Sequence, residues 1–472
     1  MTIAPDLTAA KHPYPARYTT PFILYPPALW ANKVGNAFTA NLGLDEVGQD
    51  FVLYLSVPFC RVRCLSCPYF IDLLAPRDPH GKEARYVDAV IRDLEHWASY
   101  RRFQTGKLRA VYLGGGTGSI LSTPNLKRIV DTIITNFPHE PELEVTLEGN
   151  ARDYTDDKLD YVADSPISRV SLGVQSFDAG LLRTIGSPHA AEQSTRAITG
   201  LTDRGFENIQ IDMMYNMPGH RREIWQADLN RLRDLAVKHL TTYLYRVHPG
   251  TPQDKLINIG RVQPLLDKES TYVRSMYADL VESTARAGFR TYMFDHYCVP
   301  GWENTYNEWT FHRNNVEILG VGPSAYGFIN NYRIGAKKDV EEYIAAVGRG
   351  EHMITAVSDQ LTPQVRRERY VINVLQYFGV DLDEYQRCFG SEFLDDFRAP
   401  VDRIINRSLA TLEGRQLTLT ELGREWHMNV MLEFTNDMFW QDSTALSHPH
   451  WAMNTPMVDL FAGSRESWLG AS

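Results

Sequence analysis

Hydrophobic and polar positions follow two alternating periods along the first three quarters of the chain. Short runs rich in β-branched and aromatic residues predict strands at residues 51–57, 109–115, 143–149, 169–175, 209–215 and 241–247. Apolar residues recur at helical spacing between these runs, over residues 82–100, 124–137, 191–205 and 223–239. Strands that alternate with helices of this length indicate parallel βαβ units. The pattern therefore predicts an α/β fold built on a partial or complete parallel (β/α) barrel.

The spacing of apolar and polar residues changes near residue 360, which suggests a second folding unit. After the segment "LTP" (361–363) come helical patterns and then "LTLTELG", which reads as a strand followed by a helix cap. These features predict a small domain of helices and a hairpin, similar to a winged helix. We expect four parts, namely a Pro-rich N-terminal extension at 1–48, the barrel at 49–355, the C-terminal domain at 356–440 and a tail at 441–472.

Composition narrows the class of partner. The 472 residues contain 48 Lys and Arg against 58 Asp and Glu, and no basic block that would neutralise a phosphate backbone. We therefore expect no nucleic-acid partner. The N-terminus lacks the apolar core of a signal peptide, and no apolar run is long enough to span a bilayer. The sequence predicts a cytoplasmic protein with no membrane partner.

Polar and glycine residues are expected at the C-terminal ends of the predicted strands, where barrel enzymes carry their chemistry. A cysteine-containing loop follows the first strand, and "GGGTGS" (114–119) follows the second. Glu148, Gln175 and Asp212 come from the next three strands. Because these positions meet at one edge of a parallel sheet, they favour an active site there.

The cysteines themselves are unusual in their spacing. Of five in the chain, Cys60, Cys64 and Cys67 lie within eight positions, which does not suit a framework of paired disulfides. Gaps of four and three also match one stripe of a helix, although Pro58 and Pro68 leave room for barely two turns. A structural zinc ion normally takes four ligands, and no fourth is nearby in the sequence. Three thiolates with one open position suit a four-iron cluster.

The spacing Cys60-x-x-x-Cys64-x-x-Cys67 resembles the signature of radical S-adenosylmethionine (SAM) enzymes. Further motifs, from about residue 50 to 435, resemble the oxygen-independent coproporphyrinogen III oxidase group: "YLSVPFC", "GGGT", "RVSLGVQSFD", "IDMMYNMPG", "PGTP", "GFRTYMFDHYCVPG", "FHRN" and "GVGPSAYG". The resemblance implies a [4Fe-4S] cluster on the three cysteines, with SAM bound at the open iron and cleaved to a 5′-deoxyadenosyl radical. It also implies a protein electron donor such as flavodoxin or ferredoxin.

The resemblance also leads us to expect roles for further residues. Contacts to the SAM on the cluster are expected from Tyr54, Gly115, Gly116, Thr117, Glu148 and Tyr326. Gln175 and Asp212 would serve a second SAM. Asp295, His296 and Tyr54 are the candidates for proton transfer.

The family that the chain resembles has three activities: propionate decarboxylation, haem trafficking, and methyl or methylene transfer with two SAM molecules. Positions at which this sequence departs from the family pattern help to choose among them. Tyr69 stands where the decarboxylases carry one more cysteine, and Ser56 where the haem-trafficking proteins usually carry histidine. The sequence analysis therefore predicts a two-SAM enzyme that methylates or cyclopropanates an sp² carbon of a small natural-product aromatic or a tetrapyrrole. The alternatives are a coproporphyrinogen-type decarboxylase and a haem-binding chaperone.

Overall fold

The structure is a computed structural model of the whole chain. The residues that it describes are 13–15, 17, 25, 30–31, 35–248, 250–268, 270–313, 316–436 and 469. The predicted tail, apart from Leu469, and most of the predicted N-terminal extension lie outside these residues.

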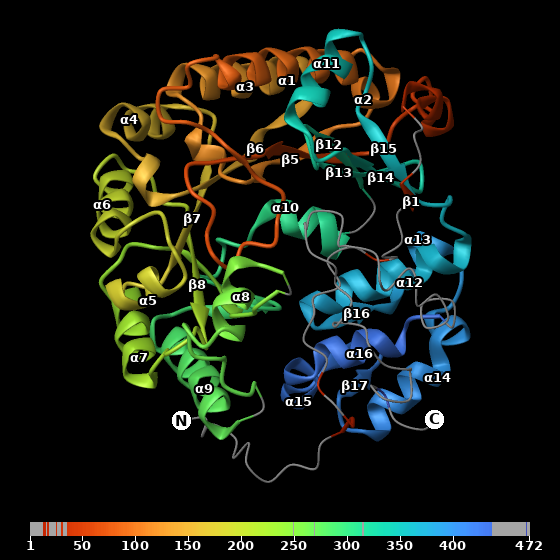
Figure 1. Cartoon of the computed structure of the whole chain (residues 1–472). Coiled ribbons are helices and arrows are strands. Elements are labelled where there is room, and N and C mark those ends of the chain that lie inside the picture. The colour runs from red at the N-terminus through yellow and green to blue at the C-terminus, as the bar shows by residue number, and fades with distance from the viewer. Residues whose placement is uncertain are drawn as a thin grey trace.

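A thirteen-stranded sheet curves through the molecule (Figure 1) in the order β1-β15-β14-β13-β12-β2-β5-β6-β7-β8-β9-β11-β10. Its central strands from β12 to β9 are all parallel. They are β12 (Glu317–Val321), β2 (Phe51–Val57), β5 (Leu108–Gly115), β6 (His139–Gly149), β7 (Arg169–Gln175), β8 (Ile209–Tyr215) and β9 (His239–Leu244). The six predicted strands are thus present, and the predicted α/β fold with an incomplete parallel barrel is confirmed.

Antiparallel strands extend the sheet at both edges, so that within the described residues the barrel stays open. On one side these are β11 (His296–Cys298) and β10 (Arg290–Met293). On the other they are β13 (Tyr326–Ile329), β14 (Tyr332–Ala336), β15 (Ile354–Val357) and β1 (Trp30–Ala31). The sheet therefore runs two residues past the predicted barrel boundary at 355.

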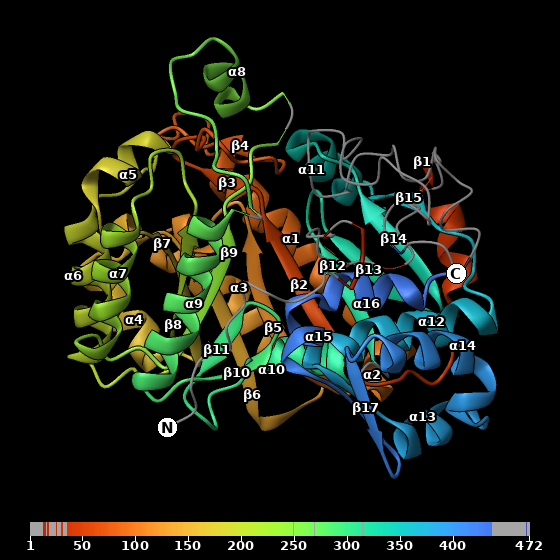
Figure 2. The same ribbon diagram turned by 90° about the horizontal axis from the view of Figure 1, so that it is seen from below.

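Helices cover the outer face of the parallel strands (Figures 1 and 2). They include α1 (Lys82–Ala98), α3 (Thr123–Asn136), α4 (Asp156–Asp164), α5 (Ala179–Thr184), α6 (Ala191–Thr202), α7 (Arg222–Asn230), α9 (Thr271–Arg286) and α11 (Val340–Gly348). Alternate strand residues such as Leu53, Leu147 and Ile211 are fully buried in the core on this outer side. Because successive strand side chains point to opposite faces, the residues between them point into the barrel.

One predicted helix is shorter than its apolar pattern indicated. The pattern over 223–239 predicted a single helix, but α7 ends at Asn230 and is followed by a 3₁₀ turn at Arg231–Arg233. Leu232 and Val237 are nevertheless buried in the same core. Apolar loop residues that pack on the core therefore occur at helical spacing, although the helix has ended and the chain turns towards β9.

A second hydrophobic core is formed mainly by residues 370–434. Its helices are α12 (Pro363–Val374), α13 (Leu382–Phe389), α14 (Phe393–Asn406), α15 (Glu421–Glu425) and α16 (His427–Glu433). They pack with a three-stranded antiparallel sheet in the order β16 (Gly379–Asp381), β18 (Gln416–Leu419), β17 (Ala410–Glu413). The helices and the β17–β18 hairpin agree with the expected element types, and the division of the chain into domains stays a prediction.

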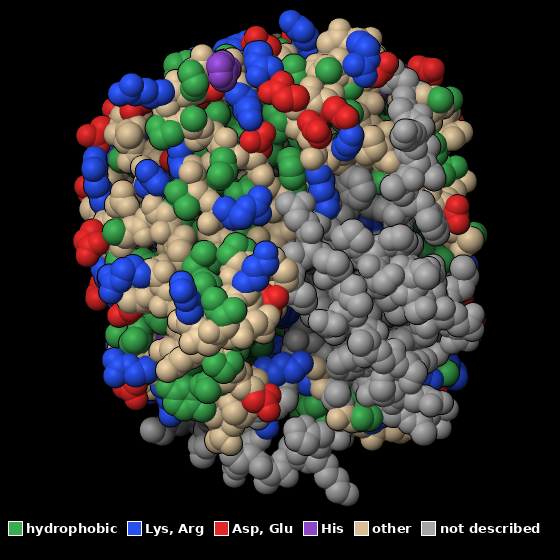
Figure 3. All heavy atoms as spheres, viewed as in Figure 1, with side chains coloured by type: hydrophobic (Ala, Val, Ile, Leu, Met, Phe, Trp, Pro, Cys, Tyr) green, Lys and Arg blue, Asp and Glu red, His purple; other side chains and the backbone are tan. Residues whose placement is uncertain are grey.

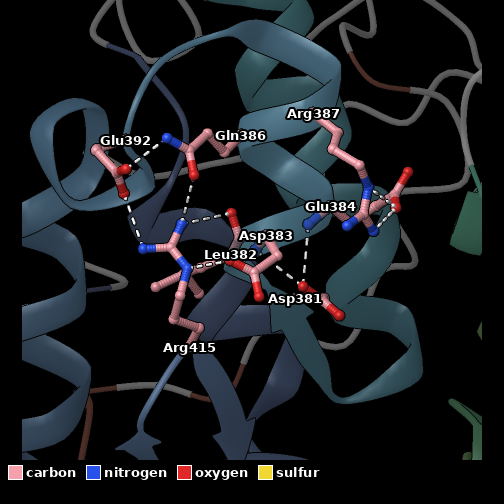
Figure 4. Close-up of polar contacts among 8 residues, drawn as sticks. All are labelled: Asp381, Leu382, Asp383, Glu384, Gln386, Arg387, Glu392 and Arg415. Atoms are coloured by element: carbon pink, nitrogen blue, oxygen red, sulfur yellow. Dashed lines mark hydrogen bonds and ion pairs between the residues drawn. The ribbon is translucent and has the colours of Figure 1, made fainter.

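Arg415, in the β17–β18 turn, ties the hairpin to α13 (Figure 4). It donates hydrogen bonds to Leu382 O at 3.2 Å and to the carboxylates of Asp383 and Glu392. Asp381 caps the same helix, because its carboxylate accepts the backbone N–H of Asp383 at 2.9 Å. The network fixes the start of α13 on the surface of the C-terminal region.

A buried ion pair joins the short helix α2 (Arg101–Thr105) to β12. The Nε and Nη2 of Arg102 each lie 2.8 Å from an oxygen of Glu317, and both residues are less than 5% exposed. Glu317 also accepts the backbone N–H of Asn330 at 2.8 Å. Since β12 pairs directly with β2, this contact supports the strand that leads into the cysteine loop.

We expect Arg102→Ala to lower the free energy of unfolding by about 3–5 kcal/mol, because it leaves the Glu317 carboxylate buried without its counter-charge. Urea denaturation followed by circular dichroism measures this. The matched control is Arg128→Ala, whose ion pair with Asp88 is exposed at the surface and should contribute less than about 1 kcal/mol. Equal losses in the two variants would contradict the assigned role of the buried pair.

Candidate active site

The cysteine loop follows β2 and is held by backbone hydrogen bonds on both sides. Leu65 N donates to Ile185 O at 3.0 Å, and Leu65 O accepts from Gln253 N at 3.0 Å. The loop begins and ends in the small parallel pair β3 (Phe59–Cys60) and β4 (Asp72–Leu73). No helix forms between residues 61 and 67, so the alternative in which the cysteines mark a helical stripe is wrong.

The three thiols are half-buried and lie close together. Burial is the largest cause that raises their pKa values, to about 12 for Cys60 and about 11 for Cys64, and the neighbouring thiols add to it. The pKa of Cys67 is raised by the same burial and lowered by the charge of Arg63. Ligating thiolates are deprotonated, so they need a compensating positive centre in this position.

The described residues contain no group of three or more His, Cys, Asp or Glu side chains that converges on one metal ion. An iron–sulfur cluster does not require such convergence, because each thiolate binds a different iron at the corner of the cluster. The loop therefore fits a [4Fe-4S] cluster better than a zinc ion.

The glycine loop after β5 lies against the cysteine loop. Gly114 and Gly115 pair with Ser56 and Val57 in the β2–β5 register. A Cβ atom on Gly116 would lie 2.7 Å from the Phe59 carbonyl oxygen, so only glycine fits there. The chain continues into Thr117, whose Oγ1 lies 3.4 Å from Cys60 Sγ. Thr117, one of the predicted SAM-binding residues of this loop, is thus in contact with the first predicted cluster ligand.

Glu148 lies on the inner face of β6, beside the glycine loop. A Cβ on Gly114 would lie 2.5 Å from its Oε2, so the carboxyl group occupies space that a side chain would fill. It accepts hydrogen bonds from the Gly115 N–H and the Tyr112 hydroxyl. Burial, followed by the charge of Asp212, raises the pKa of Glu148 to about 8. The carboxyl group is therefore mostly protonated at pH 7 until a positive charge binds beside it.

Gln175 ends β7, and Asp212 lies in the middle of the neighbouring strand β8. Gln175 adopts a left-handed backbone conformation, with φ 67°, and its buried Oε1 has no hydrogen-bond partner among the described residues. Asp212 accepts hydrogen bonds from Gln210 Nε2 at 2.6 Å and Ser171 Oγ at 3.3 Å, and burial raises its pKa to about 6. A strained residue with an unused amide oxygen is typical of a ligand contact.

Tyrosines line the inner face of the sheet near these carboxyl groups. The rings of the predicted SAM neighbours Tyr54 and Tyr326 lie 5.1 Å apart, and Tyr112 lies 6.2 Å from Tyr54. Tyr243 is 42% exposed although it belongs to β9, and Tyr69 of the cysteine loop is 41% exposed. An inner-face side chain of a central strand can be exposed only where the barrel interior is open to solvent.

Burial raises the pKa of Tyr243 well above its usual value, and the charges of Asp212, Asp295 and Glu148 add to this effect. We did not predict Tyr243 or Tyr112 as site residues. Strand alternation could have found both residues. The side chains of Tyr243 on β9 and Tyr112 on β5 point to the inner face of the sheet, as do those of Asp212 on β8 and Glu148 on β6.

The three candidates for proton transfer differ in their pKa values. Burial raises the pKa of Asp295 to about 7, which suits proton exchange near neutral pH. Burial lowers the pKa of His296 to about 4, and both its ring nitrogens are engaged, Nδ1 with Phe294 O at 2.7 Å and Nε2 with Asn307 at 3.2 Å. Burial also raises the pKa of Tyr54 well above its usual value. Of the three, Asp295 therefore has the pKa that best suits proton transfer near pH 7.

A buried guanidinium was also missed by sequence reasoning. Arg169, at the start of β7, is fully buried and donates a hydrogen bond to Gln210, which in turn donates to Asp212. Its Nη2 lies 3.4 Å from His239 Nδ1, and His239 Nε2 lies 2.7 Å from the Tyr292 hydroxyl. The charge of Arg169 lowers the pKa of Asp212 and so partly offsets the effect of burial.

The sequence model of the radical SAM superfamily matches residues 54–236, which contain the cysteine loop, the glycine loop, Glu148, Gln175 and Asp212. Over these residues the chain is similar to the radical SAM superfamily. A [4Fe-4S] cluster and SAM are the cofactors of that superfamily, and the donor set of the cysteine and glycine loops fits both. Cys60, Cys64 and Cys67 would hold the cluster, and the glycine loop with Glu148 would hold SAM.

Three curated relatives resemble most of this chain. The heme chaperone HemW of Lactococcus lactis is 28% identical over 385 residues, which cover 81% of this chain and 97% of the relative. The anaerobilin synthase of Escherichia coli O157:H7 is 24% identical, with coverage of 80% and 82%. The oxygen-independent coproporphyrinogen III oxidase of Salmonella typhimurium is 23% identical, with coverage of 81% and 84%. Over most of its length the chain is therefore similar to coproporphyrinogen oxidases and heme chaperones.

A solved structure agrees in fold. Coproporphyrinogen III oxidase (HemN) from Escherichia coli superposes with a TM-score of 0.73 at 20% identity, covering 84% of this chain and 92% of that one. In the described part of this chain, no helix combines the length and the apolar composition needed to cross a bilayer.

We expect SAM binding near pH 7 to release a proton from Glu148, because the positive charge of SAM favours the ionised carboxylate. Titration calorimetry of the anaerobically reconstituted protein, in buffers of different ionisation enthalpy, measures the number of protons released. Glu148→Gln should reduce that number. The control is Glu142→Gln, an exposed position on the same strand, which should leave it unchanged. An unchanged proton release in Glu148→Gln would show that another group titrates.

Proposed function

We propose that the protein is a radical SAM enzyme whose substrate is a tetrapyrrole of the haem or porphyrinogen class. The single observation that carries this proposal is the exposed aromatic and acidic lining of the barrel interior, which reaches from Tyr69 of the cysteine loop to Tyr243 on β9. Exposed aromatic faces suit a flat, largely apolar ligand. Two of the relatives carry a tetrapyrrole in their names, heme in one and coproporphyrinogen in the other.

The chain's own residues have separate tasks in this proposal. When bound, the cluster and SAM supply a 5′-deoxyadenosyl radical that can take a hydrogen atom from the substrate. Glu148, held by Gly115 and Tyr112, orients the positive end of SAM. Tyr69 and Tyr243 hold the flat substrate, and Asp295 accepts or returns a proton at its carboxyl oxygen. The buried lower part of the interior, around Arg169, excludes water.

The ionisable groups of the candidate site support the proposal of an enzyme rather than of a haem carrier. Glu148, Asp212 and Asp295 have pKa values of about 8, 6 and 7, all shifted mainly by burial. Carboxyl groups shifted towards neutral pH are typical of sites that move protons. A site that only holds haem has less need of them.

Methyl or methylene transfer from a second SAM is a second candidate, as the sequence departures had suggested. Two groups on the paired strands β7 and β8 support it. The Oε1 of Gln175 has no hydrogen-bond partner among the described residues and offers an acceptor, and Asp212 offers a negative charge for a further cationic ligand. None of the names of the three curated relatives mentions this transfer, so it ranks below the tetrapyrrole proposal.

The deciding assay combines the anaerobically reconstituted protein, dithionite and methyl-labelled SAM with haem, with coproporphyrinogen III and with an aromatic compound that is not a tetrapyrrole. We expect 5′-deoxyadenosine to form in step with a new tetrapyrrole product, as measured by mass spectrometry. Label in the product, together with S-adenosylhomocysteine, would select methyl transfer. Loss of carboxyl groups without label would select decarboxylation. Tight haem binding without any substrate-coupled SAM cleavage would reject the enzyme in favour of the chaperone.

We also expect Tyr243→Ala to weaken tetrapyrrole binding about tenfold, because an aromatic contact contributes about 0.5–1.5 kcal/mol beyond its buried area. Absorbance titration with haem measures the affinity. Tyr272→Ala is the matched control, since that tyrosine is 38% exposed on the outer helix α9. If the two variants bind haem equally well, the interior of the barrel is not the tetrapyrrole site.

A further inference from the structure

Two arginines reach the inner face of the sheet at the end away from β9. Arg333 belongs to β14, and its Cα pairs with that of Phe328 on the antiparallel strand β13. Directly opposed residues of two antiparallel strands present their side chains on the same face. Phe328 packs in one cluster with the inner-face residues Tyr54 and Tyr326. The side chain of Arg333 therefore points to the interior of the barrel.

Arg369 reaches the same place from helix α12. Its guanidinium carbon lies 4.1 Å from the centre of the Phe328 ring, which is a cation–π contact. Both arginines are thus neighbours of Phe328, and the charge of Arg369 acts on Arg333. The hydroxyl group of Tyr326 interacts electrostatically with both of them. We call Arg333 and Arg369 the arginine pair.

The arginine pair is withdrawn from solvent. Arg333 is 4% exposed, and Arg369 is half-buried. Burial, with a further contribution from the charge of Arg369, lowers the pKa of Arg333 to about 9. Burial also lowers the pKa of Arg369 to about 10. Charged side chains usually lie at the surface, as do the many Lys, Arg, Asp and Glu groups in Figure 3. Two buried like charges are costly, and an anion bound between them would offset that cost.

Two carboxylates lie near the arginine pair in the sequence or in the sheet. Glu317 of β12 is bound to the buried Arg102. Glu368 precedes Arg369 on α12 and accepts the Tyr25 hydroxyl at 2.7 Å. Both keep their negative charge in these contacts, yet the pKa of Arg369 is lowered, so burial outweighs the favourable charges around it. The surroundings of the arginine pair therefore still favour an added anion.

The arginine pair borders the candidate active site. Tyr326 lies two residues before Phe328 on β13, and its ring lies 5.1 Å from that of Tyr54. Tyr69 and Tyr243, which we propose as contacts of the flat substrate, belong to the cysteine loop and to β9. A ligand that spans the interior therefore meets aromatic rings on one side and positive charge on the other.

We propose that Arg333 and Arg369 bind a carboxylate side chain of the tetrapyrrole substrate and so orient its ring. The inference rests on the proposed function and deepens it, because haem and coproporphyrinogen both carry propionate groups at the edge of the ring. Guanidinium groups match carboxylates through paired, charge-assisted hydrogen bonds. The arginine pair selects acidic substrates over neutral ones, and holding one edge of the ring determines which carbon faces the SAM site.

The test measures the binding of two ligands to the anaerobically reconstituted protein with SAM. Coproporphyrin III carries the carboxyl groups, and its fully amidated derivative keeps the ring but removes their charges. Absorbance titration gives the affinity of each ligand for the wild type and for Arg333→Gln with Arg369→Gln. Arg369→Gln alone is also measured, because it leaves the more deeply buried Arg333 in place. The control is Arg366→Gln, at an exposed position of the same helix.

We expect the wild type to bind the acid at least about tenfold more tightly than the amide, since hydrogen bonds between charged groups are the stronger ones. The double variant should lose at least about tenfold in affinity for the acid, and its affinity for the amide should stay within about twofold of the wild type. Arg369→Gln should lose part of the same preference, and Arg366→Gln should keep all of it.

Three results would overturn the role of the arginine pair while leaving the tetrapyrrole proposal in place. They are equal binding of acid and amide by the wild type, an equal loss in Arg366→Gln, and an equal weakening of both ligands in Arg369→Gln. The last would show a general packing defect instead of a lost charge contact. A wild type that binds neither ligand would overturn the tetrapyrrole proposal and this inference with it.

Discussion

The parallel register between β2 and β5 is the constraint on which the candidate site depends. It sets Ser56 opposite Gly114 and Val57 opposite Gly115, so that the two strands end together and their loops leave side by side. The Gly116 N–H then bonds to Val57 O at 2.8 Å, and no Cβ fits between Gly116 and Phe59. A shift of one residue would exchange the two faces of the strand and separate the glycine loop from the cysteines.

Strand alternation then divides the chemistry between the two faces of the sheet. The outer face is apolar and holds the helices, whereas the inner face carries ionisable groups that are costly to bury. Arg169 offsets part of this cost through its link to Gln210 and Asp212. Carboxyl groups with pKa values near neutrality are the consequence, because burial penalises their charge while the buried guanidinium compensates only in part.

The fold and the first part of the site could be predicted from the sequence because both depend on local signals. Six parallel strands followed from periodicity, and the cysteine spacing predicted a cluster loop, which stays a prediction. Tyr243 and Arg169 could not be found in this way, since they resemble ordinary core residues until the barrel brings distant strands together. The same limit applies to His296, whose two ring nitrogens are engaged by Phe294 and Asn307 only in the folded chain. The sequence predicts an end of α7 that is too late, because the loop residues that follow the helix and pack on the core have the apolar spacing of a helix.

The backbone bonds of the cysteine loop have a consequence for cluster assembly. Leu65 is anchored to Ile185 and Gln253, and the Leu74 N–H bonds to Cys60 O at 3.1 Å, so the loop has a defined shape that owes nothing to iron. In small zinc domains the metal itself provides the folding energy. In this chain the barrel provides it, and a protein stripped of its cluster by oxygen would keep the loop ready for iron and sulfide to be inserted again.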